Sequence, residues 1–205
     1  MLIRVLLLLF LLLPFTAQAQ IILVFGDSLS AAYGMPVEQG WVALLQDRLS
    51  SRGYPYSIAN ASISGDTTAS ARVRLPQALS RTEPAVVVLE LGGNDGLRGL
   101  SLQEMKNNLA AMIDSARDSG ARVLLVGVQL PPNYGPVYTE RFQAVYRQLA
   151  RELEVNLLPS LMDGVGLQPA LMQSDGVHPN AQAQPVILEQ VWDRLAPMLE
   201  SAGPS

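Results

Sequence analysis

The chain has 205 residues, no cysteine and a single histidine, and its formal net charge at pH 7 is −4. This length suits one full-sized α/β domain and is short for two. The absence of cysteine excludes disulfides, thiolate chemistry and cysteine zinc sites. The chain also lacks a basic cluster interleaved with aromatic residues, so nothing indicates binding to nucleic acid.

The first nineteen residues have the pattern of a cleaved signal peptide. Arg4 supplies a positive charge, residues 5–13 are an unbroken apolar run, and residues 17–19 read Ala-Gln-Ala, a small-x-small cleavage site. We expect cleavage after residue 19 and a periplasmic mature protein whose net charge is about −5, because Arg4 is lost. A membrane anchor is the alternative, but a span needs about 20 apolar residues and this run is nearer half that length.

The first stretch of the mature chain predicts a strand with a serine just after its end. Residues 21–25 are apolar and stop at Gly26, which predicts a buried parallel strand followed by a helical turn. Ser28 would then lie at the carboxyl edge of the sheet, where open parallel sheets bind ligands. We interpret Ser28 as a nucleophile, although on this stretch alone a helix-capping serine is the simpler interpretation.

Strands and helices alternate through the rest of residues 20–205, which we expect to form a single domain. The helical spacing of Trp41, Leu44, Leu45 and Leu49, ended by Gly53, predicts a helix with one apolar face. Asp66 or Thr67 should cap a second helix. Further strands are predicted at residues 57–61, 85–91, 121–128 and 155–158, and further helices at 101–119, 139–152 and 185–199.

Other residues of interest follow or end these strands. Gly65 precedes a helix and either leaves its own N–H unpaired or only satisfies a turn. Asn94 lies in a glycine-rich stretch, residues 92–96, that is typical of a turn. Glu90 lies inside the most apolar predicted strand, so we expect it to be structural and bound by an arginine or by several N–H groups. Residues 129–137 form a proline-rich loop with apolar side chains, typical of a pocket wall.

The only histidine, His178, lies three residues after Asp175. This spacing lets the carboxylate reach Nδ1 and leaves Nε2 free to act as a base toward a serine hydroxyl. A surface turn is the simpler interpretation of so short a pattern. A metal site is a weaker alternative, because one histidine without cysteine would have to rely on carboxylates.

Acyl transfer by a serine also needs donors for the negative oxygen of the tetrahedral intermediate. The N–H groups of Ser28 and Gly65 and the side-chain amide of Asn94 are suitable donors. In a parallel α/β sheet, all three come from loops at one edge.

Four blocks in this order resemble the SGNH (GDSL) hydrolase family: Gly26-Asp27-Ser28-Leu29, Gly65, Gly92-Gly93-Asn94-Asp95 and Asp175-x-x-His178. The whole mature chain, including the segments between the blocks, is similar to the periplasmic acyl hydrolases of Gram-negative bacteria within that family. The resemblance implies a flavodoxin-like three-layer α/β/α sandwich with a five-stranded parallel sheet. No Gly-x-Ser-x-Gly elbow is present, so the chain is not an ordinary α/β-hydrolase.

The resemblance also implies roles for individual residues. Ser28 would be the nucleophile, His178 the general base and then acid, and Asp175 the residue that orients the histidine. Ser28, Gly65 and Asn94 would form the oxyanion hole, and no cofactor or metal ion is expected.

We therefore expect a monomeric serine esterase that acts on small-molecule acyl esters and thioesters, with arylesterase, lysophospholipase and acyl-CoA thioesterase activities. Lysophospholipids or exogenous esters are favoured because export separates the enzyme from cytosolic acyl-CoA. A carbohydrate deacetylase on the same scaffold is the alternative. A flavodoxin-like binding module without catalysis is disfavoured, because the chain lacks a Gly-x-Gly-x-x-Gly or P-loop pattern. The side chains expected near the acyl chain are Leu97, Leu130, Pro131, Tyr134 and Tyr138.

Overall fold

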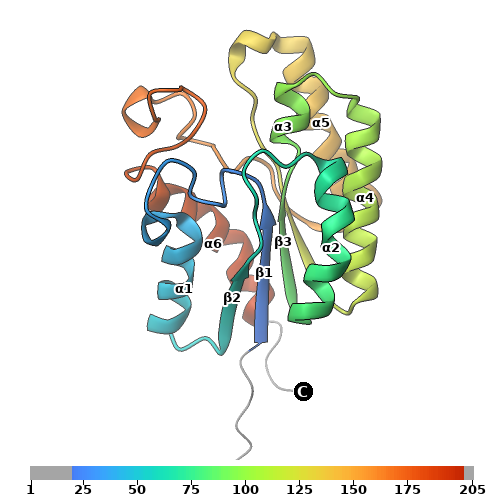
Figure 1. Ribbon diagram of the computed structural model, residues 1–205, viewed down its shortest axis with the longest axis vertical. Coiled ribbons are helices and arrows are strands. Elements are labelled where there is room, and N and C mark those ends of the chain that lie inside the picture. The colour runs from blue at the N-terminus through green and yellow to red at the C-terminus, as the bar shows by residue number, and fades with distance from the viewer. Residues whose placement is uncertain (1–19, 201–205) are drawn as a thin grey trace, which may run out of the picture.

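The computed structural model describes residues 20–200, and the predicted signal peptide lies outside the described residues. Five parallel strands form one sheet in the order β2-β1-β3-β4-β5 (Figure 1). The strands are β1 (Gln20–Gly26), β2 (Tyr56–Asn60), β3 (Val86–Glu90), β4 (Arg122–Val126) and β5 (Asn156–Leu158). The helices are α1 (Trp41–Ser51), α2 (Thr68–Thr82), α3 (Gly93–Leu97), α4 (Leu102–Asp118), α5 (Pro136–Glu152) and α6 (Gln184–Glu200), with short 3-10 turns at Val37–Gln39, Pro132–Tyr134 and Pro169–Leu171.

The helices cover both faces of the sheet. Helices α1 and α6 pack against each other on one face, and α2, α4 and α5 form a row on the other (Figure 1). All five residues of β3 are buried, which is why the strand reads as a continuous apolar run in place of an alternating one. The predicted three-layer sandwich with a five-stranded parallel sheet is therefore confirmed. Within residues 20–200, no helix combines the length and the apolar character that crossing a membrane requires.

The strand order reverses direction between β1 and β3, as in the flavodoxin-like arrangement. The chain leaves β1 toward α1 on one face and leaves β3 toward α4 on the other (Figure 1). Loops that diverge in this way leave a crevice at the carboxyl edge of the sheet, where such folds bind ligands. Ser28 follows β1 and Asn94 follows β3, so they flank this crevice.

The predicted strands and helices begin or end up to three residues away from the observed ones, and two differences have a clear structural reason. Strand β4 ends at Val126 and not at residue 128, because the backbone of Gly127 passes directly beside the segment after β5: a Cβ on Gly127 would lie 2.2 Å from the carbonyl oxygen of Pro159. Residues 92–96, predicted as a turn, instead contribute to the short helix α3. Gly92 lets it begin, with a φ of 114° that favours glycine.

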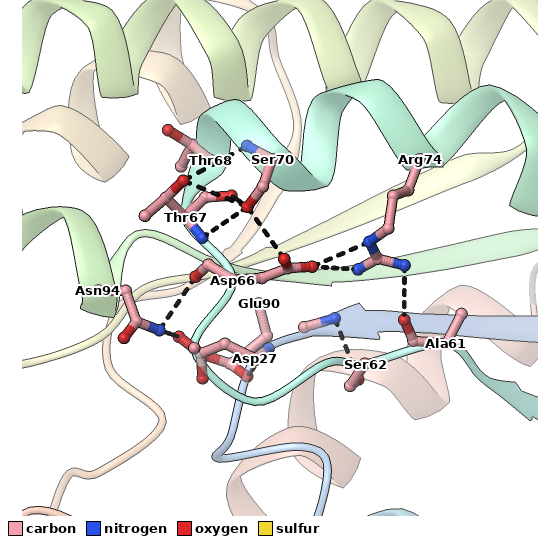
Figure 2. A network of polar contacts seen from close by, with 12 residues as sticks. Asp27, Ala61, Ser62, Asp66, Thr67, Thr68, Ser70, Arg74, Glu90 and Asn94 are labelled. Carbon is pink, nitrogen blue, oxygen red and sulfur yellow. Dashed lines mark hydrogen bonds and ion pairs between the residues drawn. The ribbon is translucent and has the colours of Figure 1, made fainter.

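The cap of α2 is Thr67 and not Asp66. The Thr67 hydroxyl accepts a hydrogen bond from the Ser70 N–H, and the Ser70 hydroxyl accepts one from the Thr67 N–H, which is a capping box. Asp66 instead binds Arg74 through an ion pair, and Arg74 also donates to the carbonyl of Ala61 at 3.2 Å (Figure 2). These contacts fix the loop that leads from β2 into α2.

Candidate active site

The structure brings Ser28, His178 and Asp175 together in one hydrogen-bonded chain. His178 Nδ1 lies 2.7 Å from Asp175 Oδ2, and His178 Nε2 lies 2.9 Å from Ser28 Oγ. A carboxylate accepts the Nδ1 hydrogen, so Nε2 carries a lone pair and the serine hydroxyl donates to it. Residues 150 positions apart in the sequence thus form the arrangement that removes a proton from a serine hydroxyl.

Asp175 is held as a carboxylate by its own turn. Its Oδ1 accepts hydrogen bonds from the N–H groups of Val177 at 2.9 Å and His178 at 3.0 Å. Partial burial acts to raise the pKa of Asp175, but these N–H groups and the His178 ring outweigh it and lower the pKa to about 2. The carboxyl group next to His178 is therefore ionised at neutral pH.

The segment that carries His178 is closed on itself and attached to the turn after Ser28. Met172 and Pro179 form an isolated antiparallel bridge, and the Gln173 N–H donates to the His178 carbonyl at 2.8 Å. The Gln173 side chain then donates from Nε2 to two carbonyls, that of Tyr33 at 2.7 Å and that of Pro179 at 3.0 Å. The Tyr33 ring also lies against the imidazole, with ring centroids 4.4 Å apart.

The candidate oxyanion donors lie on three loops at this edge. Within residues 20–200, neither the N–H of Ser28 nor that of Gly65 donates a hydrogen bond to another protein group. Asn94 differs, because its Nδ2 donates to Asp27 Oδ2 at 3.1 Å and to the Asp66 carbonyl at 3.0 Å (Figure 2). Two backbone donors are thus available, and the amide donor is already occupied.

A pair of buried carboxyl groups lies directly below the nucleophile turn. Asp27 is 2% exposed and Glu90 is 0% exposed. Burial raises the pKa of Asp27 to about 6, against the opposing effects of the Leu29 N–H, the charge of His178 and the amide of Asn94. Burial, together with the neighbouring charge of Asp27, raises the pKa of Glu90 well above its ordinary value.

The predicted environment of Glu90 was wrong. No arginine binds it; its Oε2 accepts from the Ser30 hydroxyl at 2.7 Å and from the Asp27 N–H at 3.4 Å, and its Oε1 has no partner within the described part of the chain. A carboxyl group can be buried without a cation when it takes up a proton, and the raised pKa of Glu90 is the sign of that. Burial thus favours the protonated, uncharged form of Glu90.

A mainly apolar pocket of about 170 Å³ is lined by Ser28 and His178 among other residues. Three of the side chains predicted to contact the acyl chain, Leu97, Leu130 and Pro131, line it. The other lining residues are Asp27, Leu29, Gly93, Asn94, Val128, Gln129, Pro132, Met162, Gly166, Leu167, Met172, Gly176 and Val177. Gly65 is not among them, and its carbonyl accepts from the exposed side chain of Arg98 at 3.0 Å.

Two predicted contact residues, Tyr134 and Tyr138, are not among the residues that line the pocket. The Tyr134 hydroxyl donates to the Leu97 carbonyl at 2.9 Å, and the Tyr138 hydroxyl donates to the Gly96 carbonyl at 3.1 Å. The two rings stack on each other, with centroids 6.3 Å apart. Both tyrosines therefore hold α3 in place through its carbonyls and so support the part of the pocket wall that Leu97 forms.

The sequence did not reveal the opposite wall. Met162, Leu167 and Met172 line the pocket from residues 159–180, a segment without regular periodicity. Only its apolar residues between turn-forming glycines could have suggested a wall, and that signal does not show which way they face. Among residues 20–200, no cluster of three or more histidine, aspartate or glutamate side chains is placed to hold a metal ion.

The fold and the site define a class before any comparison is made. A flavodoxin-like sheet carries a serine, a histidine and an aspartate in hydrogen-bond contact at its carboxyl edge, beside free backbone N–H groups and an apolar pocket. This combination is that of a serine hydrolase for acyl substrates. The pattern of the GDSL-like Lipase/Acylhydrolase family matches residues 24–184, and the chain belongs to this family.

Relatives agree over nearly the whole chain. It is 54% identical to Esterase TesA of Pseudomonas aeruginosa over 183 residues, which cover 89% of this chain and 91% of that protein. It is 44% identical to the Thioesterase 1/protease 1/lysophospholipase L1 of Escherichia coli K12, over 89% of this chain and 86% of that protein. A crystal structure titled TesA superimposes with a TM-score of 0.86 at 54% identity, covering 87% of this chain and 99% of the other.

Proposed function

We propose that the chain hydrolyses acyl esters and thioesters through an acyl-enzyme on Ser28. The observation that carries this proposal is the continuous Asp175-His178-Ser28 hydrogen-bonded chain, with separations of 2.7 Å and 2.9 Å, at the mouth of the apolar pocket. The names of the relatives, an esterase and a thioesterase with lysophospholipase activity, support the same reaction.

In the first half of the reaction, Ser28 Oγ attacks the acyl carbon while His178 Nε2 takes its proton. The carbonyl π electrons move to oxygen, and the N–H groups of Ser28 and Gly65 stabilise the oxyanion. The Asn94 amide joins them when the oxyanion replaces one of its two present acceptors. The ionised Asp175 stabilises the imidazolium that forms.

The bond to the alcohol or thiol then breaks, His178 returns the proton to this leaving group, and the acyl-enzyme on Ser28 is complete. A water molecule then attacks the acyl carbon of the ester on Ser28, with His178 again as the base. Collapse of this second intermediate releases the carboxylic acid and restores the serine hydroxyl. The full cycle needs only groups present in the chain and one water molecule.

The decisive experiment is labelling of the purified mature protein by a fluorophosphonate, followed by assay on p-nitrophenyl esters. We expect labelling at Ser28, and we expect Ser28→Ala to lose labelling and to lower kcat by at least about 10⁴-fold. Ser80→Ala, an exposed serine on α2, is the matched control and should behave as wild type. Hydrolysis by Ser28→Ala above background would show that the nucleophile is another residue.

The pocket supports a preference for acyl chains of intermediate length. Each methylene buried against Leu97, Leu130 and Met162 contributes about 0.8 kcal/mol, or about fourfold in kcat/KM, until the pocket is filled. A panel of p-nitrophenyl esters, lysophospholipids, acyl-CoA thioesters and acetylated sugars measures this preference. Activity confined to the acetylated sugars would instead identify a carbohydrate deacetylase.

We further propose that the protein is exported, cleaved after residue 19 and monomeric. The signal-peptide pattern in residues 1–19 supports export, and the size of the core supports a stable single domain without disulfides. Mass spectrometry of periplasmic extract should find a mature protein that begins at Gln20. Light scattering should give the mass of one chain.

A further inference from the structure

Asp27 connects the loop of the nucleophile to the loop of the oxyanion amide. Its Oδ1 accepts from the Leu29 N–H at 3.1 Å, immediately after Ser28, and its Oδ2 accepts from Asn94 Nδ2 at 3.1 Å. Gly93 allows this approach, because a Cβ there would lie 3.2 Å from Asp27 Oδ2. The two loops follow different strands, β1 and β3, so one carboxylate sets their relative position.

Glu90 holds the same turn from below. Its Oε2 accepts from the Asp27 N–H, which precedes Ser28, and from the Ser30 hydroxyl, which follows it. The space for this carboxyl exists because residue 26 is glycine: a Cβ on Gly26 would lie 2.7 Å from Glu90 Oε2 and 2.8 Å from Ser30 Oγ. Both contacts on either side of the nucleophile therefore end on one carboxyl oxygen.

We propose that Asp27 and Glu90 are positioning residues of the hydrolytic reaction, Glu90 by holding the turn that carries Ser28 and Asp27 by orienting the Asn94 amide toward the oxyanion. The inference rests on the proposed function, since it assigns Ser28 and Asn94 the roles given above. Neither carboxyl touches the reacting atoms. Both are buried at a cost in free energy that an apolar pair of similar size would not incur.

The contacts of Asn94 explain why an acceptor is needed at Asp27. Both hydrogens of the amide are in use, one on the Asp27 carboxylate and one on the Asp66 carbonyl (Figure 2). Hydrogen bonds to an ionised group are the stronger, so the oxyanion replaces the Asp66 carbonyl while Asp27 continues to fix the amide plane. An asparagine at position 27 has one acceptor oxygen for two donors, the Leu29 N–H and Asn94 Nδ2, so it cannot hold both loops as the carboxylate does.

A double-mutant cycle tests whether Asp27 acts through Asn94. We expect Asp27→Asn to lower kcat on p-nitrophenyl butyrate by about 10 to 100-fold, with KM within threefold of wild type. When Asp27→Asn is added to Asn94→Ala, kcat should fall by less than about threefold relative to Asn94→Ala alone. Active sites are counted by fluorophosphonate labelling in each variant, so unfolded protein does not enter kcat. Losses that multiply independently would overturn the role of Asp27.

Glu90 is tested by two substitutions of similar volume. The amide oxygen of Glu90→Gln can accept the Ser30 and Asp27 hydrogens, so this variant should keep kcat within about threefold of wild type. Glu90→Met has no acceptor and should lose at least about tenfold in kcat per labelled site at unchanged KM. Ser30→Ala, which removes one of the two contacts and is a small change, should fall between them. The role of Glu90 would be overturned if Glu90→Met and Ser30→Ala both kept the kcat of wild type. It would also be overturned if Glu90→Gln and Glu90→Met lost the same factor in kcat.

The same samples separate this inference from the proposed function. Wild type that is neither labelled at Ser28 nor active on esters overturns both. Wild type that is labelled and active, with independent losses in the cycle and no difference among the Glu90 variants, overturns the positioning roles alone. Ser80→Ala again serves as the control and should match wild type in kcat and KM.

Discussion

Asp27 and Asp175 are two carboxyl groups on either side of Ser28 whose surroundings move their pKa values in opposite directions. Asp175 is on the surface and receives three hydrogen bonds from its own turn and from His178, so its pKa is about 2. Asp27 is buried, and burial raises its pKa to about 6. One carboxyl is thus kept ionised for the reaction, and the other is ionised only at a cost to the folded state.

The burial of Asp27 predicts an unusual dependence of stability on pH. Its pKa rises from the ordinary 3.8 to about 6 on folding, so the folded state binds this proton more tightly than the unfolded state. The resulting stabilisation is complete below about pH 3.8 and is lost as the pH rises through 6. Two pKa units correspond to about 3 kcal/mol.

Urea unfolding of wild type and Asp27→Asn between pH 4.5 and pH 7.5 measures this contribution. We expect the difference in the free energy of unfolding to shift against wild type by about 2 kcal/mol over this interval. Asp175 does not interfere, because its contribution is present above pH 3.8 and is lost only as the pH falls toward 2. Parallel curves for the two proteins would show that Asp27 is not buried as an ionised group.

A second prediction at this scale concerns Asp175 itself. Asp175→Asn removes the charge that stabilises the imidazolium and allows the wrong tautomer of His178, so kcat should fall by about 10⁴-fold. KM should change far less, since Asp175 does not line the acyl pocket. Asp163→Asn, at an exposed aspartate on the same irregular segment, is the matched control. A loss of less than tenfold in Asp175→Asn would contradict the assigned role.

Among the elements, α3 shows why a sequence can indicate a site and still miss its shape. Its five residues include two glycines, which are poor helix formers, so local propensity predicts a turn. The helix is held from outside: the Asp95 carboxylate accepts from the Thr68 N–H at 2.9 Å and the Thr68 hydroxyl at 2.6 Å, and two tyrosines bind its carbonyls. These contacts join residues 27 to 42 positions apart and leave no local pattern.

Throughout the chain, features set by local sequence could be predicted, and features set by contacts between distant segments could not. The strands and long helices were predictable because apolar periodicity is a local property. The candidate residues Ser28, Asp175 and His178 could be singled out because Ser28 follows a strand and the other two form a short Asp-x-x-His motif. The hydroxyl partner of Glu90, the pocket wall at Met162 and Met172 and the outward position of the tyrosines depend on packing between distant segments. No spacing in the sequence reports such packing.

The support of α3 by tyrosine is open to a direct test. Tyr138→Phe removes the hydrogen bond to the Gly96 carbonyl, worth about 1 kcal/mol, and loosens the wall that Leu97 forms. We expect KM for a medium-chain ester to rise about fivefold while KM for an acetyl ester stays within twofold. The control is Tyr56→Phe, which changes a buried tyrosine in β2, an edge strand of the sheet. Equal changes for both esters would argue against a role in the acyl pocket.

For the molecule as a whole, the first and last helices are tied together next to the nucleophile turn. The Gln184 side chain, 1% exposed at the start of α6, accepts from the Trp41 N–H at 3.0 Å at the start of α1. The Trp41 indole in turn donates to the Leu29 carbonyl at 3.2 Å. The C-terminal helix is thus connected, through one helix start, to the residue after Ser28.

Removing this connection should lower stability more than it lowers activity. Gln184→Ala leaves the buried Trp41 N–H without its acceptor and should reduce the free energy of unfolding by about 1 to 3 kcal/mol. The rate per labelled active site should stay within threefold of wild type at a temperature where both are folded. Gln182→Ala, at an exposed position two residues earlier, should leave both quantities unchanged. A fall of more than threefold in kcat per labelled site would show that α6 also shapes the site.

The Gln173 side chain, which bridges the carbonyls of Tyr33 and Pro179, matters most at the moment when the proposed cycle is half complete. Once the acyl group is attached to Ser28 Oγ, that oxygen has no hydrogen to donate and its hydrogen bond to His178 no longer exists. The Gln173 bridge is untouched by this step, and Gly34 leaves it room, since a Cβ there would lie 2.2 Å from Gln173 Oε1. In the proposed cycle, this bridge would keep the Ser28 and His178 segments at the same spacing in both half-reactions, so that His178 is in place when water enters for hydrolysis.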